Sequence, residues 1–138
     1  MLKKINLGIA VDTEDGLFAP VLRDVGERDE GDLRNGLEEM KKDTVDRDLP
    51  PEKLRGATLT LSNFGVFGAG RFAALVVIPP QVALIGAGRV AARVVGLEGK
   101  PTVRQMLPLS ITFDHRVVSG GEAARFLAAV IEYLGQMD

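Results

Sequence analysis

The residue best suited to chemistry in this sequence is His115. It is the only histidine of the chain, and histidine ordinarily takes up and releases protons near neutral pH. Apolar and polar residues alternate over 109–113, which predicts a half-buried strand, and apolar residues recur at helical spacing over 123–134. A histidine where a strand passes into a helix is well placed to face a cleft. The alternative is that His115 is an ordinary polar residue of the surface or of the core.

Two serines and an aspartate complete the candidate set. Ser119 precedes Gly120 and Gly121 and is a candidate helix N-cap or turn residue. Ser62 ends a strand expected over 57–62, where its ordinary role is to bond the backbone of the loop that follows. Asp114 adjoins His115, but neighbours on an extended chain point to opposite sides, so it is not an obvious partner for the imidazole. The chain also lacks the G-x-S-x-G motif of a hydrolase triad.

Composition narrows the classes of function. The 138 residues suit one domain, and 46% hydrophobic residues suffice for a core. A formal net charge of −2 gives no indication of nucleic-acid binding. The absence of cysteine excludes disulfides, zinc–thiolate sites and a cysteine nucleophile. With a single histidine, we expect no metal site.

The most apolar run, residues 72–90, raises the question of a membrane span. Pro79 and Pro80 in its middle favour two buried strands instead, of which the second covers 82–90. Met1 to Lys4 lead straight into an alternating pattern, and no signal peptide is visible. We therefore expect a soluble cytoplasmic protein with no membrane partner.

Several other elements follow from periodicity and turn signals. We expect a strand over 5–11, a tight turn at Asp15–Gly16, a returning strand over 17–22, a helix that buries Leu33, Leu37 and Met40, a turn at 98–101, and one long strand over 102–113. Gly86 and Gly88 follow a strand, as the glycines of a dinucleotide-binding motif do, but β-like residues rather than a helix come after them. We interpret these two glycines as positions of close backbone packing.

Four segments together resemble one family. Phe113 to Val118 with Gly120 resemble the active-site signature of the dihydrolipoyl acyltransferase cores of 2-oxo acid dehydrogenase complexes, and residues 8–24, 60–68 and 77–81 resemble further motifs of that family. The resemblance implies an α/β fold: a mixed β-sheet with packed helices, similar to chloramphenicol acetyltransferase. Residues 1–138 then form a single, partial catalytic domain that lacks the first part, with no lipoyl or peripheral-subunit-binding domain.

The resemblance also implies a function. Acyl groups would pass between the thiols of dihydrolipoamide and coenzyme A, both as substrates, with the lipoyl group carried on another domain. His115 would be the general base and Ser62 the oxyanion donor, contributed by neighbouring subunits of a homotrimer that could build a larger cage. The partners would be the decarboxylase and dihydrolipoamide dehydrogenase components.

Position 119 departs from the family pattern. Ser119 stands where the family usually has Asp, and a hydroxyl does not balance a charge. The alternative hypothesis is therefore a non-catalytic core or assembly module, inactive because of truncation and of Ser119. We retain Ser119 as the third candidate site residue.

Overall fold

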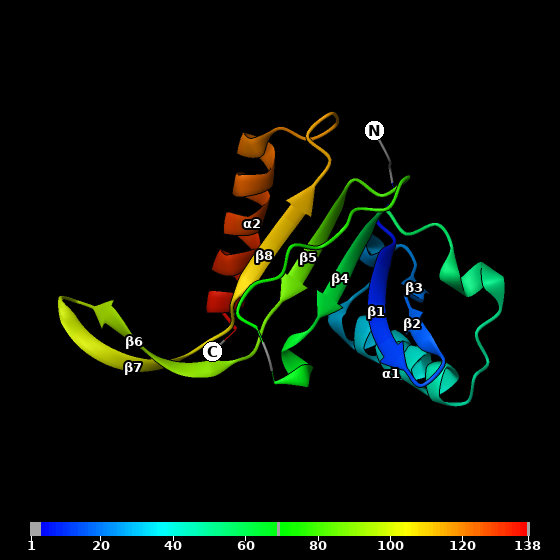
Figure 1. The fold of residues 1–138 in the computed structure, drawn as a ribbon, viewed down its shortest axis with the longest axis horizontal. Coiled ribbons are helices and arrows are strands. Elements are labelled where there is room, and N and C mark those ends of the chain that lie inside the picture. The colour runs from blue at the N-terminus through cyan, green and yellow to red at the C-terminus, as the bar shows by residue number, and fades with distance from the viewer. Residues whose placement is uncertain (1–3, 69, 138) are drawn as a thin grey trace.

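The computed structural model describes residues 4–68 and 70–137. Met1 to Lys3, Ala69 and Asp138 lie outside this range, as do the parts of two expectations that fall on them: the absence of a signal peptide at Met1 to Lys4 and the single domain over 1–138. Its main element is a six-stranded sheet with the order β2–β1–β4–β5–β8, in which β3 also pairs with β1 (Figure 1). The strands are β1 (Leu7–Thr13), β2 (Gly16–Phe18), β3 (Val21–Leu22), β4 (Leu59–Asn63), β5 (Ala83–Ala87), β6 (Ala91–Leu97), β7 (Lys100–Met106) and β8 (Leu109–Phe113). The helices are α1 (Glu30–Val45) and α2 (Gly120–Gly135), with 3₁₀ turns at Val25–Glu27, Pro51–Leu54 and Gly65–Phe67.

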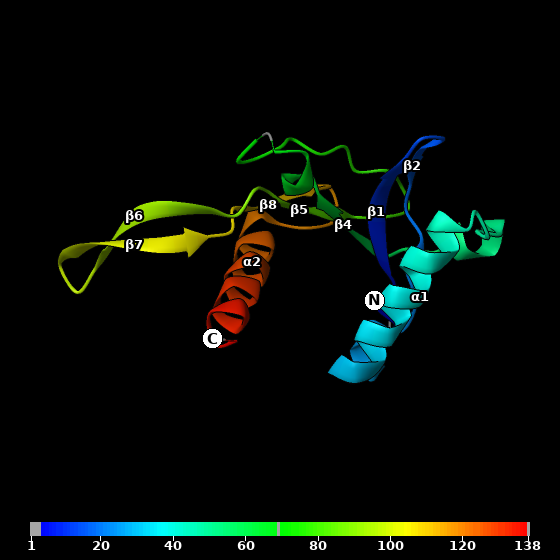
Figure 2. The same cartoon turned by 90° about the horizontal axis from the view of Figure 1, so that it is seen from below.

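The sheet is mixed, as expected. β1, β4 and β5 run parallel to one another, whereas β2, β3 and β8 are antiparallel to their neighbours. Both helices lie on one side of the sheet, and the segment after β4 crosses the other side (Figure 2). The predicted α/β architecture with packed helices is confirmed.

Local sequence signals explain where α1 begins and which face it buries. The Asp29 side chain accepts a hydrogen bond from the N–H of Asp32 over 2.8 Å and caps the helix. Met40 is buried, and Leu33 and Leu37 are half-buried, which confirms the predicted apolar face.

Prolines divide two of the expected strands. The prediction of one long strand over 102–113 was wrong, because β7 ends before Leu107–Pro108 and β8 begins after them. The strand predicted over 17–22 is likewise split at Pro20 into β2 and β3. Proline has no N–H to donate to a neighbouring strand. Both prolines still accept hydrogen bonds: the carbonyl of Pro20 accepts from the N–H of Ile9 and that of Pro108 from the N–H of Gly88, each over 2.9 Å.

The prediction of two buried strands over 72–90 was also wrong. Only β5 belongs to the sheet, and residues 72–78 form no strand. Both edges of β5 are already paired, with β4 and β8, so no position beside it is free. Val76 and Ile78 remain largely exposed. Within the described residues, neither helix has the length and apolar character needed to span a membrane.

Strands β6 and β7 form a separate hairpin that projects away from the sheet (Figure 1). Glu98 and Gly99, which connect them, both have positive φ, at 49° and 75°. Such a two-residue turn matches the natural twist of a hairpin. The turn predicted at 98–101 is confirmed, and the strand after Gly88 leaves no helix for a nucleotide motif.

Gly88 allows two chain segments to cross in contact. A Cβ atom at this position would collide with the backbone carbonyl of Arg71, and one at Gly65 would collide with the carbonyl of Gly88. The predicted close backbone packing is confirmed at Gly88, whereas the closest neighbours of Gly86 are side chains. The crossing at Gly88 places the segment after β4 against the sheet.

We expect Gly88→Ala to lower the free energy of unfolding by about 1–3 kcal/mol, because backbone atoms that meet the new methyl group must shift. Gly96→Ala is the matched control, since no atom lies within 4 Å of a Cβ there. Urea unfolding of both variants measures the difference. Equal effects at the two positions would contradict this account of the crossing.

Candidate functional site

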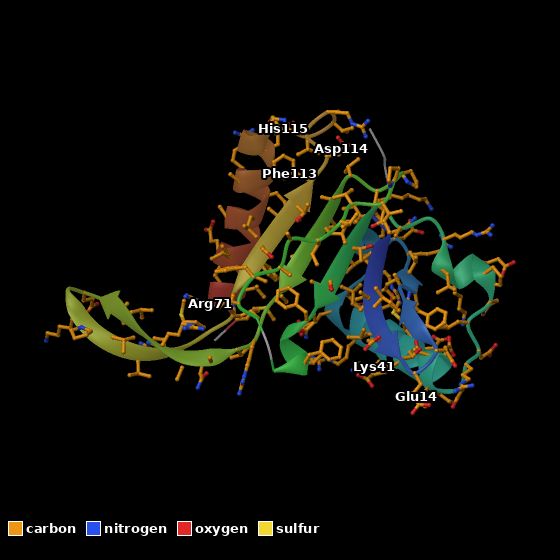
Figure 3. The ribbon with its side chains drawn as sticks, in the orientation of Figure 1. Glu14, Lys41, Arg71, Phe113, Asp114 and His115 are labelled. Atoms are coloured by element: carbon orange, nitrogen blue, oxygen red, sulfur yellow. The ribbon has the colours of Figure 1, made fainter. Side chains whose placement is uncertain are left out.

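His115 lies in a tight turn between β8 and α2 (Figure 3). The N–H of Asp114 donates to the carbonyl of Val82 over 2.8 Å and extends the β5–β8 pairing by one residue. The carbonyl of Asp114 then accepts from the N–H groups of Val117 and Val118, each over 3.0 Å. The turn that carries His115 is therefore anchored to the sheet at its start.

The imidazole of His115 is exposed at the first turn of α2. Its ring centroid lies 5.5 Å from that of Phe113, with the planes tilted by 43°. A Cβ on Gly120 would lie 3.9 Å from Nε2. Among the described residues, no side chain forms a hydrogen bond with the ring. Such an imidazole is accessible to a substrate, as a general base must be.

Asp114 is not a partner of the imidazole, as the sequence suggested, and it pairs with Arg116 instead. Its carboxylate accepts from the N–H, Nε and Nη2 of Arg116 over 3.0, 2.9 and 2.6 Å. These side-chain and backbone hydrogen bonds lower the pKa of Asp114 to about 2. Its role is therefore to brace the turn as a carboxylate with its own counter-charge.

Ser119 is the N-cap of α2, as predicted. Its Oγ accepts from the N–H of Glu122 over 3.3 Å, and the carboxylate of Glu122 accepts from the N–H and the hydroxyl of Ser119. This reciprocal pair is a capping box. The hydroxyl of Ser119 thus bonds Glu122, and the described contacts do not join it to His115.

Ser62 lies within β4, one residue before its end. It pairs with Ala10 of β1 and Gly86 of β5, and Gly86 in turn pairs with Ser110 of β8. Side chains in such a row point to one face. A Cβ on Gly86 would meet the ring of Phe64, so this row faces the segment that crosses the sheet opposite the helices.

A cavity of about 350 Å³ adjoins Ser62 at the ends of β1 and β4. Its wall includes Asn63, Val66 and Phe67 after Ser62, and Lys41 on α1. Sequence reasoning did not select Lys41, because only the fold brings α1 to this edge of the sheet.

Ser62 and His115 of one chain lie at opposite ends of the sheet. Ser62 shares its row with Ser110, near the start of β8, whereas His115 follows the end of that strand. The four residue steps from Ser110 to Asp114 alone span roughly 13 Å along the strand. A single subunit therefore does not bring these two side chains together.

Sequence reasoning also missed Glu122. The spacing S-x-x-E before an apolar helix is a signal of a capping box and could have identified it. Within residues 4–68 and 70–137, no group of three or more metal-binding side chains is found.

Solved structures share this fold. The chain is similar to Azotobacter vinelandii dihydrolipoamide acetyltransferase, with a TM-score of 0.84 and 35% identity over 94% of this chain and 53% of that one. That structure belongs to work on a serine, a histidine and an asparagine in the catalytic mechanism. A probable dihydrolipoamide acetyltransferase from Listeria monocytogenes matches with a TM-score of 0.93 and 25% identity, over 99% of this chain and 58% of that one. The fold is that of an acyltransferase core.

The sequence comparisons identify the family. The family model for the 2-oxoacid dehydrogenases acyltransferase (catalytic domain) matches residues 1–138, and the chain belongs to this family. It is 33% identical to a succinyltransferase component of the 2-oxoglutarate dehydrogenase complex from Rickettsia bellii, over 94% of this chain and 32% of that protein. It is 36% identical to an acetyltransferase component of the pyruvate dehydrogenase complex from Mycobacterium bovis, over 91% and 23%. The chain thus spans about a quarter to a third of these relatives and about half of the solved chains.

The Asp114–Arg116 ion pair should make the stability of the fold depend on pH under acidic conditions. Because the folded-state pKa of Asp114 is below its ordinary value of 3.8, its stabilising contribution is present above that value and is lost as the pH falls through about 2. We expect Arg116→Gln to reduce the loss of stability over this range, because the pKa of Asp114 then returns towards 3.8. Urea midpoints at a series of pH values measure this.

Arg34→Gln is the control for that series, since Arg34 pairs with Glu30 over 3.8 Å between two highly exposed side chains. Acid titrations of stability that coincide for the wild type and Arg116→Gln would show that the Asp114–Arg116 pair does not stabilise the fold.

Proposed function

We propose that this chain is the catalytic-core part of a dihydrolipoamide acyltransferase of a 2-oxo acid dehydrogenase complex. It would transfer an acyl group between the thiol of dihydrolipoamide and the thiol of coenzyme A. The observation that carries the proposal is the exposed imidazole of His115 in a turn braced at both ends, within a chain that matches the family model over its whole length.

In the proposed mechanism His115 is the general base. A neutral ring nitrogen takes the proton of the attacking thiol, which by itself ionises mainly above neutral pH. The thiolate adds to the thioester carbonyl, and the hydroxyl of Ser62 donates a hydrogen bond to the oxyanion that forms. Collapse of this intermediate expels the second sulfur, which takes the proton back from the imidazolium. No acyl group is attached to the protein, in agreement with a chain without cysteine.

The proposed site lies between subunits. The separation of Ser62 and His115 within one chain supports this, because the ends of two neighbouring sheets could supply one residue each. Exposed apolar side chains are also numerous, including Val94 and Val103 on the hairpin and Ile131 and Tyr133 on α2. One similar structure is the cubic core of a pyruvate dehydrogenase multienzyme complex, at 36% identity and a TM-score of 0.80.

By this proposal the chain forms a homotrimer, which could build a larger cage, and it works with the decarboxylase and dihydrolipoamide dehydrogenase components. The cytoplasmic location expected from the sequence stays a prediction.

We expect purified protein to be a homotrimer or a larger assembly, because the shared site needs two subunits and a closed ring covers apolar surface. Light scattering at micromolar concentration measures the mass. A monodisperse monomer would contradict both the assembly and the shared site.

A mixing experiment tests the two catalytic roles directly. Separately, His115→Ala should lower kcat by about 10²–10⁴-fold, as for a general base, and Ser62→Ala by about 10²–10³-fold, as for an oxyanion donor. After the two variants are unfolded and refolded together in equal amounts, roughly a quarter of the sites in a closed ring should contain both wild-type residues and regain activity.

The control for this mixture is each variant refolded alone, which should keep its own lowered kcat. If the wild type is active but the refolded mixture gains no activity, Ser62 and His115 either act within one subunit or lie outside the site. A wild type that assembles but transfers no acyl group between acyl-CoA and dihydrolipoamide would favour the alternative, a non-catalytic assembly module.

A further inference from the structure

The carboxylate of Glu122 closes the turn that carries His115. Oε2 of Glu122 accepts from the N–H of Ser119 over 2.8 Å and from its hydroxyl over 2.7 Å. The turn begins at Asp114, which is bonded to the sheet, and it ends at Ser119, which is bonded to this carboxylate. The four residues between them are therefore held at both ends.

The imidazole lies near the residue that follows the backbone position bonded by Glu122. Gly120, whose Cβ position is 3.9 Å from Nε2 of His115, directly follows Ser119. A shift of Ser119 would move the first residue of α2 beneath the ring. Because no hydrogen bond to the imidazole is found within the described residues, the orientation of the ring depends on this backbone and on Phe113.

We propose that Glu122 is a positioning residue for His115, an inference that rests on the proposed acyl transfer. The carboxylate reaches position 119 from the first turn of α2 and fixes the backbone there through hydrogen bonds. The side-chain bond from Ser119, followed by its backbone bond, lowers the pKa of Glu122, so the group is a carboxylate near neutral pH. Since the effect passes through hydrogen bonds, glutamine, which also occurs in capping boxes, can replace it.

Activity of three variants separates positioning from simple capping. Glu122→Ala should lower kcat by about 10–10²-fold, as expected for a displacement of a catalytic group by about 1 Å, with little change in KM. Glu122→Gln should restore most of kcat. Asp29→Ala is the control: it removes the N-cap of α1, where the Asp29 side chain accepts from the N–H of Asp32, and should lower the denaturant midpoint while kcat is unchanged.

The ring protons of His115 give a measurement that needs no substrate. Since the chain has one histidine, its proton NMR spectrum contains one set of imidazole signals. Glu122→Ala should shift and broaden these signals, whereas Glu122→Gln and Asp29→Ala should leave them as in the wild type. If Glu122→Ala leaves the ring signals unchanged and affects kcat no more than Asp29→Ala does, Glu122 is only a helix cap and the inference is wrong.

The same spectra distinguish failure of this inference from failure of the proposed function. Ring signals that respond as expected, in a wild-type protein that transfers no acyl group, would support the positioning of His115 and contradict the transferase proposal. If the ring signals do not change in Glu122→Ala but the wild type transfers acyl groups, the transferase proposal is supported and the positioning of His115 by Glu122 is contradicted.

Ser119→Asp tests whether Glu122 already occupies the space beside position 119. A second carboxylate there would lie close to Oε2 of Glu122, and two like charges at hydrogen-bond distance repel. We expect Ser119→Asp to lower the denaturant midpoint of the wild type, and to lower it much less in a Glu122→Gln background. An equal loss of stability in both backgrounds would contradict this placement of the Glu122 carboxylate.

Discussion

The antiparallel pairing of β8 with β5 decides where both candidate catalytic residues lie. β4 runs parallel to β5 on its other side, so a residue late in β4 is level with a residue early in β8. Ser62 therefore shares a row with Ser110, while His115 follows the opposite end of β8. A register shift of one residue would turn Ser62 to the helix side of the sheet. Within this fold, any site that uses both groups needs a second subunit.

The parts of the fold that the sequence predicts well depend on local signals. Three examples are the alternation in β1, the apolar face of α1 with its Leu33–Leu37–Met40 spacing, and the cap at Ser119. Each of them involves residues that are close together in the sequence. The same holds for the turn at His115, where a strand pattern changes to a helical one. Such signals act on the chain before any distant contact forms.

Two errors, at Pro20 and Pro108, overlooked a local signal, because proline has no N–H for the ladder. The other errors arise where distant partners decide the structure. Residues 72–78 are as apolar as a buried strand, yet β4 and β8 already occupy both edges of β5. The split at Pro108 separates a projecting hairpin strand, β7, from a central sheet strand, β8, a difference that periodicity does not show. The separation of Ser62 from His115 is equally non-local, so the proposed shared site came from family resemblance and not from spacing. Glu122 was visible as a local pattern, but its relation to the imidazole required the fold.

The two carboxylates next to the turn of His115 each have hydrogen-bond partners other than the imidazole. Arg116 neutralises Asp114, and donors from Ser119 surround the carboxylate of Glu122. Within the described residues, no hydrogen bond joins either carboxylate to the imidazole. The described neighbours of the ring are Phe113 and the first residue of α2, Gly120, and we expect these to orient it. A Cβ at that position would lie 3.9 Å from Nε2, an ordinary van der Waals contact, so the start of α2 is a near neighbour of the ring.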